Sequence, residues 1–262
     1  MATVSDEKRE AIRPMLAETY DDGLDPTGWW ISEKLDGMRA LWTGRRLLTR
    51  NGNPIEAPFW FTIDLPDEPL DGELWVGRGG FQRTLSIVRG RAERGRWSDV
   101  RFMVFDAPAR PGGFEQRLGW AMAWFRANPS SHAQCVLQKR CRGRAHLEAE
   151  LERITSRGGE GLVLRRAGSA YEPRRAECML KVKRFDDAEA VVVGYESGRG
   201  RNAERVGALR VRLAGGVEFR LGTGLSERER EAPPQIGVSV VFRHCGVTDS
   251  GVPRHATYVG CA

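Results

Sequence analysis

Residues 33–39 of this 262-residue chain have the sequence Glu-Lys-Leu-Asp-Gly-Met-Arg, and the fold is best inferred outward from them. The preceding residues predict a strand over 28–35, and Gly37 permits a tight turn directly after Asp36. Lys34 therefore leaves a strand with an acid two residues away. A lysine amine can act as a nucleophile when burial or nearby cations lower its pKa, whereas arginine cannot lose its proton in a protein. Taken alone, the segment could equally be a charged turn.

Lysine is scarce in this chain, which makes the position of each lysine informative. The 41 basic residues comprise 5 lysines and 36 arginines, and three of the lysines are Lys34, Lys181 and Lys183. In so arginine-rich a sequence, each retained lysine is a candidate for a task that arginine does not perform.

Four further segments carry groups that suit nucleotide chemistry. They are LDGEL at 70–74, MVFD at 103–106, EGLVLR at 160–165 after a Gly-Gly turn, and LKVK at 180–183. The two lysines of the last segment lie on one face of a strand, since side chains alternate. An amine nucleophile, acids for Mg²⁺ and ribose, a flat ring for a base and paired ammonium groups for a phosphate make up a nucleotide-transfer site. Singly, Phe105 could be a core residue, Glu73 a surface charge and the lysines a solvated face.

The five segments, in this order, resemble the covalent nucleotidyltransferases and specifically the ATP-dependent DNA ligases. The sequence around these segments is similar to that of the minimal bacterial ligases called the E type. The similar stretches are 28–44, the TRNG turn at 49–52, GRGGFQRTLSIVR at 77–89, GGEGLVLRRAGSAYE at 158–172, and 207–213, 219–226, 233–237 and 246–254. The resemblance spans about Pro14 to Pro253.

The resemblance implies a role for each motif residue. Lys34 would attack the α-phosphate of ATP, release pyrophosphate and hold AMP as a phosphoramidate, and Lys181 and Lys183 would neutralise that phosphate. The remaining nucleotide ligands would be Glu33 near the adenine edge, Phe105 stacked on the ring, and Arg39 and Glu73 on the ribose. Glu160, helped by Asp36 or Glu73, would hold Mg²⁺, with Mn²⁺ as a possible substitute.

Arginines are the candidate DNA ligands. The resemblance places Arg50 at the 5′-phosphate of a nick, with Arg175 sharing that task. Phosphate contacts are also expected from the loops of 78–96, which carry six arginines, and from a Gly-rich loop near the C-terminus. The residues chosen are Arg78, Arg83, Arg89, Arg199 and Arg201. Any one of them could instead belong to an ordinary basic surface.

Two domains of α+β class are predicted: an adenylation domain over 1–184 and a small all-β domain of the OB type over 185–262. The first half alternates short strands with turns and has helices at 114–127 and 145–157, the former with Leu118, Met122 and Phe125 on one face. After residue 184 the chain has strand-like runs at 188–195, 207–213, 217–222 and 237–243, interrupted by a helical stretch at 226–231. A hinge is expected at 184–187, so that the two domains can close on DNA.

Composition restricts the possible binding partners and the possible location of the protein. The net charge is +6, of which +5 belongs to residues 1–183, so nucleic acid is a candidate partner. The sequence has no apolar run long enough for a membrane span and no secretory h-region, and its five cysteines lack metal-site spacing. We therefore expect a cytoplasmic monomer acting on nicked duplex DNA, or a periplasmic one if a leader has been removed.

Two alternatives stay open. An RNA ligase or an mRNA-capping guanylyltransferase shares the lysine motif and the paired lysines, and a non-catalytic nucleic-acid-binding module could retain the motifs as relics. One departure from the pattern concerns the C-terminus, where many ligases have an RxDK-type motif. Residues 184–262 contain no lysine, and Arg254 is the nearest candidate for that function.

Overall fold

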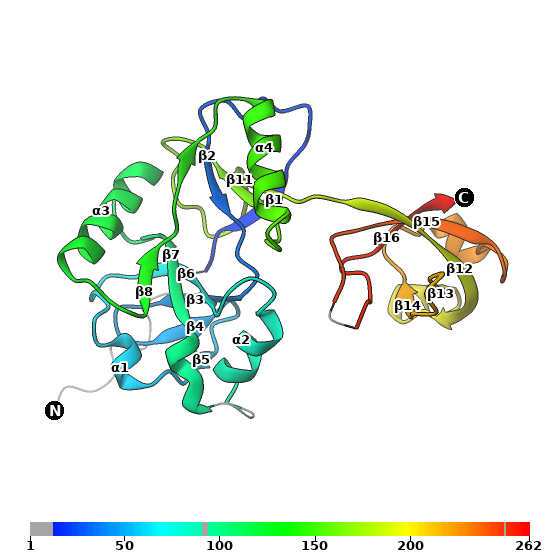
Figure 1. The fold of residues 1–262 in the computed structure, drawn as a ribbon, viewed down its shortest axis with the longest axis horizontal. Coiled ribbons are helices and arrows are strands. Elements are labelled where there is room, and N and C mark those ends of the chain that lie inside the picture. The colour runs from blue at the N-terminus through cyan, green and yellow to red at the C-terminus, as the bar shows by residue number, and fades with distance from the viewer. Residues whose placement is uncertain (1–12, 91–93, 249) are drawn as a thin grey trace. The chain divides into compact units, whose positions relative to one another are not determined.

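Three β-sheets form the framework of the described part of the chain, two of them before Lys183 and one after it (Figure 1). The computed structural model describes residues 13–90, 94–248 and 250–262. Contacts between residues divide the chain into two units, Met1–Lys183 and Arg184–Ala262. The predicted domain boundary, between residues 184 and 185, differs from this division by one residue.

The first sheet, called sheet A here, has five strands in the order β1-β11-β10-β2-β9. Their bounds are β1 (Leu16–Thr19), β2 (Trp30–Glu33), β9 (Lys139–Arg140), β10 (Leu162–Arg165) and β11 (Arg175–Val182). The β2, β10 and β11 strands pair antiparallel, whereas β1 pairs parallel with β11.

The second sheet, sheet B, has six strands in the order β5-β4-β3-β6-β7-β8. Their bounds are β3 (Met38–Trp42), β4 (Leu47–Thr49), β5 (Pro54–Ile55), β6 (Leu70–Trp75), β7 (Arg101–Asp106) and β8 (Ala133–Cys135). The connection from β2 to β3 passes through residues 34–37, so the heptapeptide 33–39 links the two sheets.

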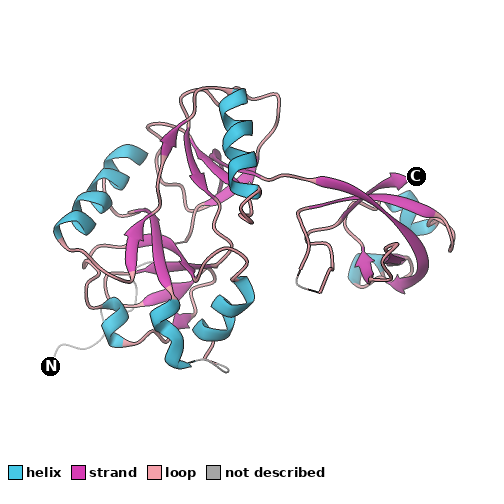
Figure 2. Cartoon of the chain, in the orientation of Figure 1, coloured by secondary structure: helices cyan, strands magenta, loops and turns pink. Residues whose placement is uncertain are grey.

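Helices flank the two sheets of this unit (Figure 2). They are α1 (Phe59–Thr62), α2 (Phe81–Val88), the 3₁₀ helix η1 (Arg94–Asp99), α3 (Phe114–Ala127) and α4 (Arg144–Thr155). The α3 helix packs on β7 and β8, and α4 contributes Leu147 and Ile154 to an apolar cluster with sheet A.

Alternation along the strands gives each sheet one apolar face and one polar face. In sheet A, Ile31, Leu164 and Leu180 share a cross-strand row and pack in the cluster beneath α4. The neighbouring row, Ser32, Val163 and Lys181, therefore lies on the opposite face.

Sheet B follows the same rule. Leu74 and Phe102 are opposite each other and pack in its core. Arg39 and Glu73, which are paired across β3 and β6, lie one residue away on the other face. The core of each sheet thus leaves a polar face, and the polar faces carry most of the predicted motif residues.

The second unit is a five-stranded antiparallel sheet in the order β14-β13-β12-β15-β16. Its elements are β12 (Asp186–Ser197), η2 (Gly200–Asn202), β13 (Val206–Arg212), β14 (Glu218–Leu221), α5 (Glu227–Glu231), β15 (Ser239–His244) and β16 (Thr257–Cys261). A bridge between Thr223, after β14, and Thr257 of β16 joins the two edges, which curls the sheet around one apolar core. Ser226 caps α5, accepting a hydrogen bond from the Glu229 backbone N–H at 3.3 Å.

The predicted elements differ from the structure in two respects. The strands β1, β5, β8, β9 and β16 and the helices α1 and α2 were not predicted, and most of them are only two to five residues long. The buried side of α3 agrees with the predicted one except at Met122. Leu118 is buried and Phe125 packs against the core, whereas Met122 is 46% exposed. The helix also buries Phe114, Arg117 and Ala121.

Candidate active site

The polar faces of sheets A and B enclose a pocket of about 260 Å³. Sheet A contributes Ser32, Val163 and Lys181, and sheet B contributes Arg39, Asp71, Glu73 and Phe105. The other lining residues are Met15, Leu16, Ala17, Glu33, Lys34, Leu35, Arg50, Phe114, Val136, Gln138, Arg165, Arg175 and Met179. Cationic groups, two phenylalanine rings and carboxylates therefore meet in one concave site.

Lys34 begins the turn that joins the sheets, and Gly37 is required for that turn. A Cβ atom at Gly37 would lie 2.2 Å from the Leu74 carbonyl oxygen, so only glycine fits against β6. The Lys34 backbone N–H donates to the Gly161 carbonyl at 2.9 Å, which fixes the start of the turn against β10.

A buried carboxylate bridges two of the motif lysines. Glu160 Oε2 accepts from Lys34 Nζ at 2.5 Å, and Glu160 Oε1 lies 2.7 Å from Lys183 Nζ. Burial acts to raise the pKa of Glu160, but the two ammonium groups outweigh it and hold that pKa below its ordinary value. In this state the carboxylate is ionised and holds both lysines together.

Lys181 lies in the pocket on the exposed side of the β10–β11 pair. Burial lowers the pKa of its ammonium group, and the positive charges of Lys183, Arg175 and Lys34 lower it further. The site thus concentrates cationic charge at one end, as a phosphate-binding site requires.

Glu73 is the most strongly perturbed carboxyl of the pocket. Burial raises its pKa to about 8, although Arg39 and Lys34 act in the opposite direction. At neutral pH this carboxyl is therefore largely protonated and can donate a hydrogen bond.

Arg39 links sheet B to the segment before β1. Its guanidinium donates two hydrogen bonds to Asp71, both at 2.6 Å, and one to the Met15 carbonyl at 3.1 Å. Tyr171 donates to the same Asp71 at 2.7 Å and accepts from the Met15 N–H at 3.1 Å. The guanidinium carbon also lies 4.5 Å from the centre of the Phe105 ring, so Arg39 covers one face of that ring.

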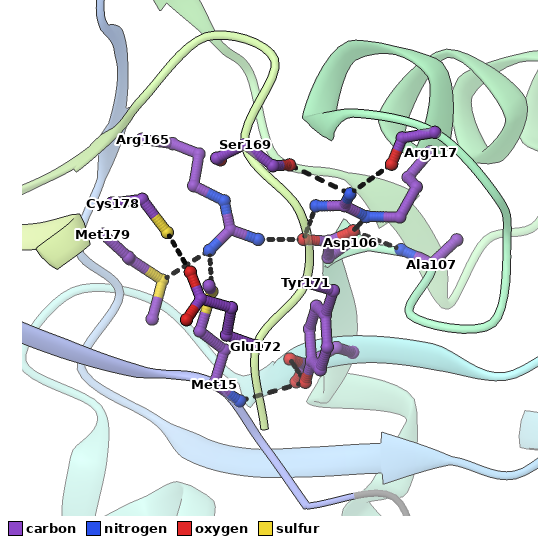
Figure 3. Close-up of polar contacts among 12 residues, drawn as sticks. Met15, Asp106, Ala107, Arg117, Arg165, Ser169, Tyr171, Glu172, Cys178 and Met179 are labelled. Atoms are coloured by element: carbon purple, nitrogen blue, oxygen red, sulfur yellow. Dashed lines mark hydrogen bonds and ion pairs between the residues drawn. The ribbon is translucent and has the colours of Figure 1, made fainter. Parts of the chain in front are cut away.

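A buried ion network, whose Arg165 also lines the pocket, ties the two sheets together (Figure 3). Asp106, at the end of β7, accepts from Arg117 of α3 at 2.7 and 3.1 Å and also pairs with Arg165 of β10. The Ala107 N–H donates to the same carboxylate at 2.9 Å. Arg117 and Arg165 were not predicted, since neither the spacing nor the composition of their segments indicates burial.

Ser32 and Gln138 are further pocket residues that the motifs did not reveal. For Ser32 the signal was present, because it lies two residues before Lys34 in a strand and so shares its face. Gln138 comes from the loop before β9, which motif spacing cannot place.

The structure brings some predicted residues together and separates others. Glu33 lines the pocket, but its carboxylate accepts from Arg78 at 2.7 and 2.8 Å. Asp36 is outside the residues that line the pocket. Arg83 forms an ion pair with Asp99 on the surface.

The other candidate DNA ligands are exposed. Arg50 lines both the pocket and an adjoining groove of about 1170 Å³ between the β4–β5 hairpin and α2, where Arg89 also lies. Arg175 lines the pocket and donates to the Ala17 carbonyl at 2.5 Å. Arg199 and Arg201 are exposed around η2 in the second unit, and part of the 78–96 segment, residues 91–93, lies outside the described residues.

Within the described ranges, no helix has the length and apolar character needed to cross a membrane.

Comparison with known proteins assigns the chain to a family. A family model described as a DNA ligase OB-like domain matches residues 197–261. A curated DNA ligase from Haemophilus influenzae is 35% identical, covering 93% of this chain and 90% of its own length. A solved structure from a structure–function study of Lig E DNA ligases is 42% identical, with a TM-score of 0.90 and coverage of 95% of this chain and 99% of that chain.

A more distant relative is much longer. The multifunctional non-homologous end joining protein LigD of Pseudomonas aeruginosa is 31% identical over 86% of this chain, which corresponds to 29% of the LigD length. These relatives favour a DNA ligase over the RNA-joining, capping and non-catalytic alternatives. Since the matches to two DNA ligases extend over nearly the whole of both chains, this protein belongs to the minimal ATP-dependent DNA ligases.

Proposed function

We propose that this DNA ligase acts as a monomer, uses ATP to form a lysyl-AMP at Lys34, and seals 5′-phosphate/3′-hydroxyl nicks in duplex DNA through a DNA-adenylate. The observation that carries the proposal is the position of the Lys34 amine. Lys34 lines a pocket that also contains phenylalanine rings and further cations, and its amine lies 2.5 Å from a buried carboxylate.

In the first step, the unprotonated Lys34 amine attacks the α-phosphorus of ATP. A nitrogen–phosphorus bond forms, the bond to the bridging oxygen breaks, and pyrophosphate leaves. As the nitrogen–phosphorus bond forms, the attacking nitrogen must lose one proton, and Glu160 Oε2 is positioned to accept it. Lys181 and Lys183 stabilise the charge that develops on the phosphate oxygens.

The nucleoside would lie between the two sheets. One face of Phe105 is covered by Arg39, which leaves the other face for the base. The protonated carboxyl of Glu73 can donate to a ribose oxygen, and Arg39, already fixed by Asp71, is the second ribose ligand. The Glu33 carboxylate is paired with Arg78, so its role at the adenine edge falls to its backbone.

The Glu160 carboxylate, which is not among the residues lining the pocket but contacts Lys34 of that lining, fits a magnesium ion that is shared with the substrate. Mg²⁺ is usually held by one or two carboxylates together with phosphate oxygens. Among the described residues there is no group of three or more His, Cys, Asp or Glu side chains that could hold a metal. Glu160 supplies an ionised carboxylate, and Glu73 would supply a second one only after losing its proton. When bound, the ion neutralises phosphate charge. Asp36 stays a predicted additional ligand of this ion.

In the later steps the 5′-phosphate of the nick takes the AMP from Lys34, and the 3′-hydroxyl then displaces AMP. Both are in-line transfers in which positioning and charge stabilisation dominate. Arg50 and Arg175, which line the pocket, are the proposed ligands of the nick phosphate. Arg89, Arg199 and Arg201 are proposed contacts to the DNA backbone, and a hinge at 184–187 would let the second unit close on the duplex.

The decisive experiment is ligation of a 5′-labelled nicked duplex with ATP and Mg²⁺, together with mass spectrometry of the protein after incubation with ATP alone. We expect the wild type to seal the nick and to gain AMP. Lys34→Ala should lose both activities, and EDTA should abolish sealing until Mg²⁺ is restored.

Lys139→Ala is the matched control, because Lys139 is 40% exposed at the side chain and paired with Glu150 away from the pocket. It should seal like the wild type. Sealing by Lys34→Ala at the wild-type rate would refute the covalent mechanism, and a GMP adduct without an AMP adduct would refute the use of ATP.

A further inference from the structure

Gln138 is a pocket residue to which the family motifs assign no role. It is half-buried in the loop just before β9 and lines the pocket. Its carboxamide forms no side-chain hydrogen bond to any other residue in the described part of the chain. A polar group of this kind, facing a pocket without a protein partner, is expected to have a ligand partner.

Strand register places Gln138 beside Ser32. The β2–β9 ladder pairs Ile31 with Lys139, so continuing it by one residue sets Ser32 opposite Gln138. Ser32 is 7% exposed, lines the same pocket, and likewise makes no side-chain hydrogen bond within the described residues. Two unpartnered polar groups therefore meet at one end of the pocket.

The same cross-strand row has cationic character at its other end. Ser32 is paired with Val163, and Val163 with Lys181, so the row runs from an amide and a hydroxyl, across an aliphatic side chain, to an ammonium group. Neighbouring strands are about 4.8 Å apart, so the row spans roughly 14 Å between its end backbones. That is the scale of a nucleoside monophosphate with side chains reaching toward it from both ends.

Charge favours one direction for a nucleotide along this row. Its α-phosphate belongs near Lys181 and Lys34, where the cations are, and the flat base then lies over Val163, opposite Phe105. The base edge farthest from the phosphate consequently points toward Gln138 and Ser32. In adenine that edge carries an amino donor at position 6 and a ring-nitrogen acceptor at position 1.

We propose that Gln138 recognises this edge of the adenine, its amide oxygen accepting from the 6-amino group while its amide nitrogen donates to the ring nitrogen. Ser32 supplies the second polar contact. A carboxamide matches adenine because it accepts and donates at adjacent positions. This inference rests on the proposed use of ATP and names the residue that selects its base.

The test compares ATP with purine riboside triphosphate, which lacks the 6-amino group and is otherwise the same. The readout is the rate of covalent nucleotidyl–protein formation by wild type, Gln138→Leu and Gln138→Glu, measured as kcat/KM for each nucleotide. The wild type should prefer ATP. In Gln138→Leu, the preference for ATP should fall by roughly 5- to 10-fold, the effect of losing one hydrogen bond to the 6-amino group.

Gln138→Glu separates recognition from packing. It keeps an acceptor for the 6-amino group but loses the donor, so it should lower the rate with both nucleotides while retaining more of the preference than Gln138→Leu. Gln134→Ala is the matched control, because Gln134 is an exposed glutamine of β8 outside the pocket lining, and it should leave both rates unchanged.

Different outcomes would refute the ligase mechanism and the role of Gln138. If the wild type formed no adduct with either nucleotide, the proposed function would be wrong. If the wild type formed the adduct and Gln138→Leu kept the full wild-type preference for ATP, the role of Gln138 would be refuted while the ligase mechanism stood.

Discussion

At the scale of single residues, the site depends on how a few charges share a buried space. Glu160 bridges Lys34 and Lys183, so one carboxylate orients both the nucleophile and a phosphate-binding cation. Arginine could supply charge at the second position, but a compact ammonium group occupies less space beside the nucleophile. The retained lysines are thus explained by reactivity at Lys34 and by geometry at Lys183.

The raised pKa of Glu73 predicts that the free enzyme loses stability as the pH rises. Its pKa is about 8 in the fold against an ordinary value of 4.5, so the folded state binds the proton more tightly. The stabilisation is complete below pH 4.5 and is lost between that value and pH 8. Glu73→Gln, which cannot ionise, should therefore show a flatter dependence of Tm on pH and exceed the wild type at about pH 8.

Thermal melts of both proteins across this range test the prediction. Glu148→Gln, an exposed glutamate of α4, serves as the control and should follow the wild-type curve. Parallel curves for wild type and Glu73→Gln would contradict the burial of an uncharged carboxyl. The same substitution should slow nucleotide transfer if Glu73 is a ligand of ribose or metal.

At the scale of elements, alternation along each strand determines which residues reach the site. Leu162, Leu164 and Leu180 are buried against α4, and this forces Val163 and Lys181 to the opposite face. Sheet B does the same with Leu74 and Phe102 on one side and Glu73 on the other. The apolar cores therefore orient the polar side chains of the site without contacting the nucleotide.

The α3 helix offers a matched pair of substitutions that tests its buried face. Leu118 is 4% exposed and Met122 is 46% exposed. Leu118→Ala should lower the free energy of unfolding by about 2–5 kcal/mol, because it leaves a cavity. Met122→Ala should change it by less than about 0.5 kcal/mol, as expected at an exposed position.

Unfolding by denaturant, followed through a spectroscopic signal of the first unit, measures both changes in the free energy of unfolding. Equal losses for Leu118→Ala and Met122→Ala would support the face predicted from the sequence, with Met122 buried, and would contradict the structure. Ligase activity at low temperature should survive in both variants, since neither residue lines the pocket.

At the scale of the whole molecule, binding to DNA is expected to draw on both units. Each phosphate contact contributes a slope of about −0.9 to the dependence of log affinity on log salt concentration. Arg50→Ala in the first unit and Arg199→Ala in the second should each reduce that slope by about one. Fluorescence anisotropy with a labelled nicked duplex at several salt concentrations measures it.

Arg110→Ala is the control, because Arg110 pairs with Glu68 and lies outside the pocket lining. Its slope should match the wild type. An unchanged slope for Arg199→Ala would mean that this loop of the second unit does not touch the backbone, and the proposed closure would then need other contacts.

Much of the site was recoverable from the sequence because its chemistry is local. Short segments whose residue types and order indicate nucleotide transfer contain Lys34, Glu73, Phe105, Glu160 and Lys181. The predominance of strand-like runs after residue 184 indicated a second domain. The helix α3 and the strand β13, with fourteen and seven residues, are long enough to show a periodic pattern. The two-residue strands β5 and β9 show none and were missed, and the eight-residue helix α2 was missed as well.

The tertiary structure alone decided how distant segments share charge and space. Arg165 and Arg117 meet at Asp106 from two different elements, and Tyr171 reaches Asp71 across 100 residues of sequence. Arg78 pairs with Glu33, which the basic character of its loop did not indicate. The sequence by itself determined which reactive groups are present and the order in which they occur. Which of them face one another depends on sheet register and packing between non-adjacent segments, and those long-range contacts are not encoded in any local pattern.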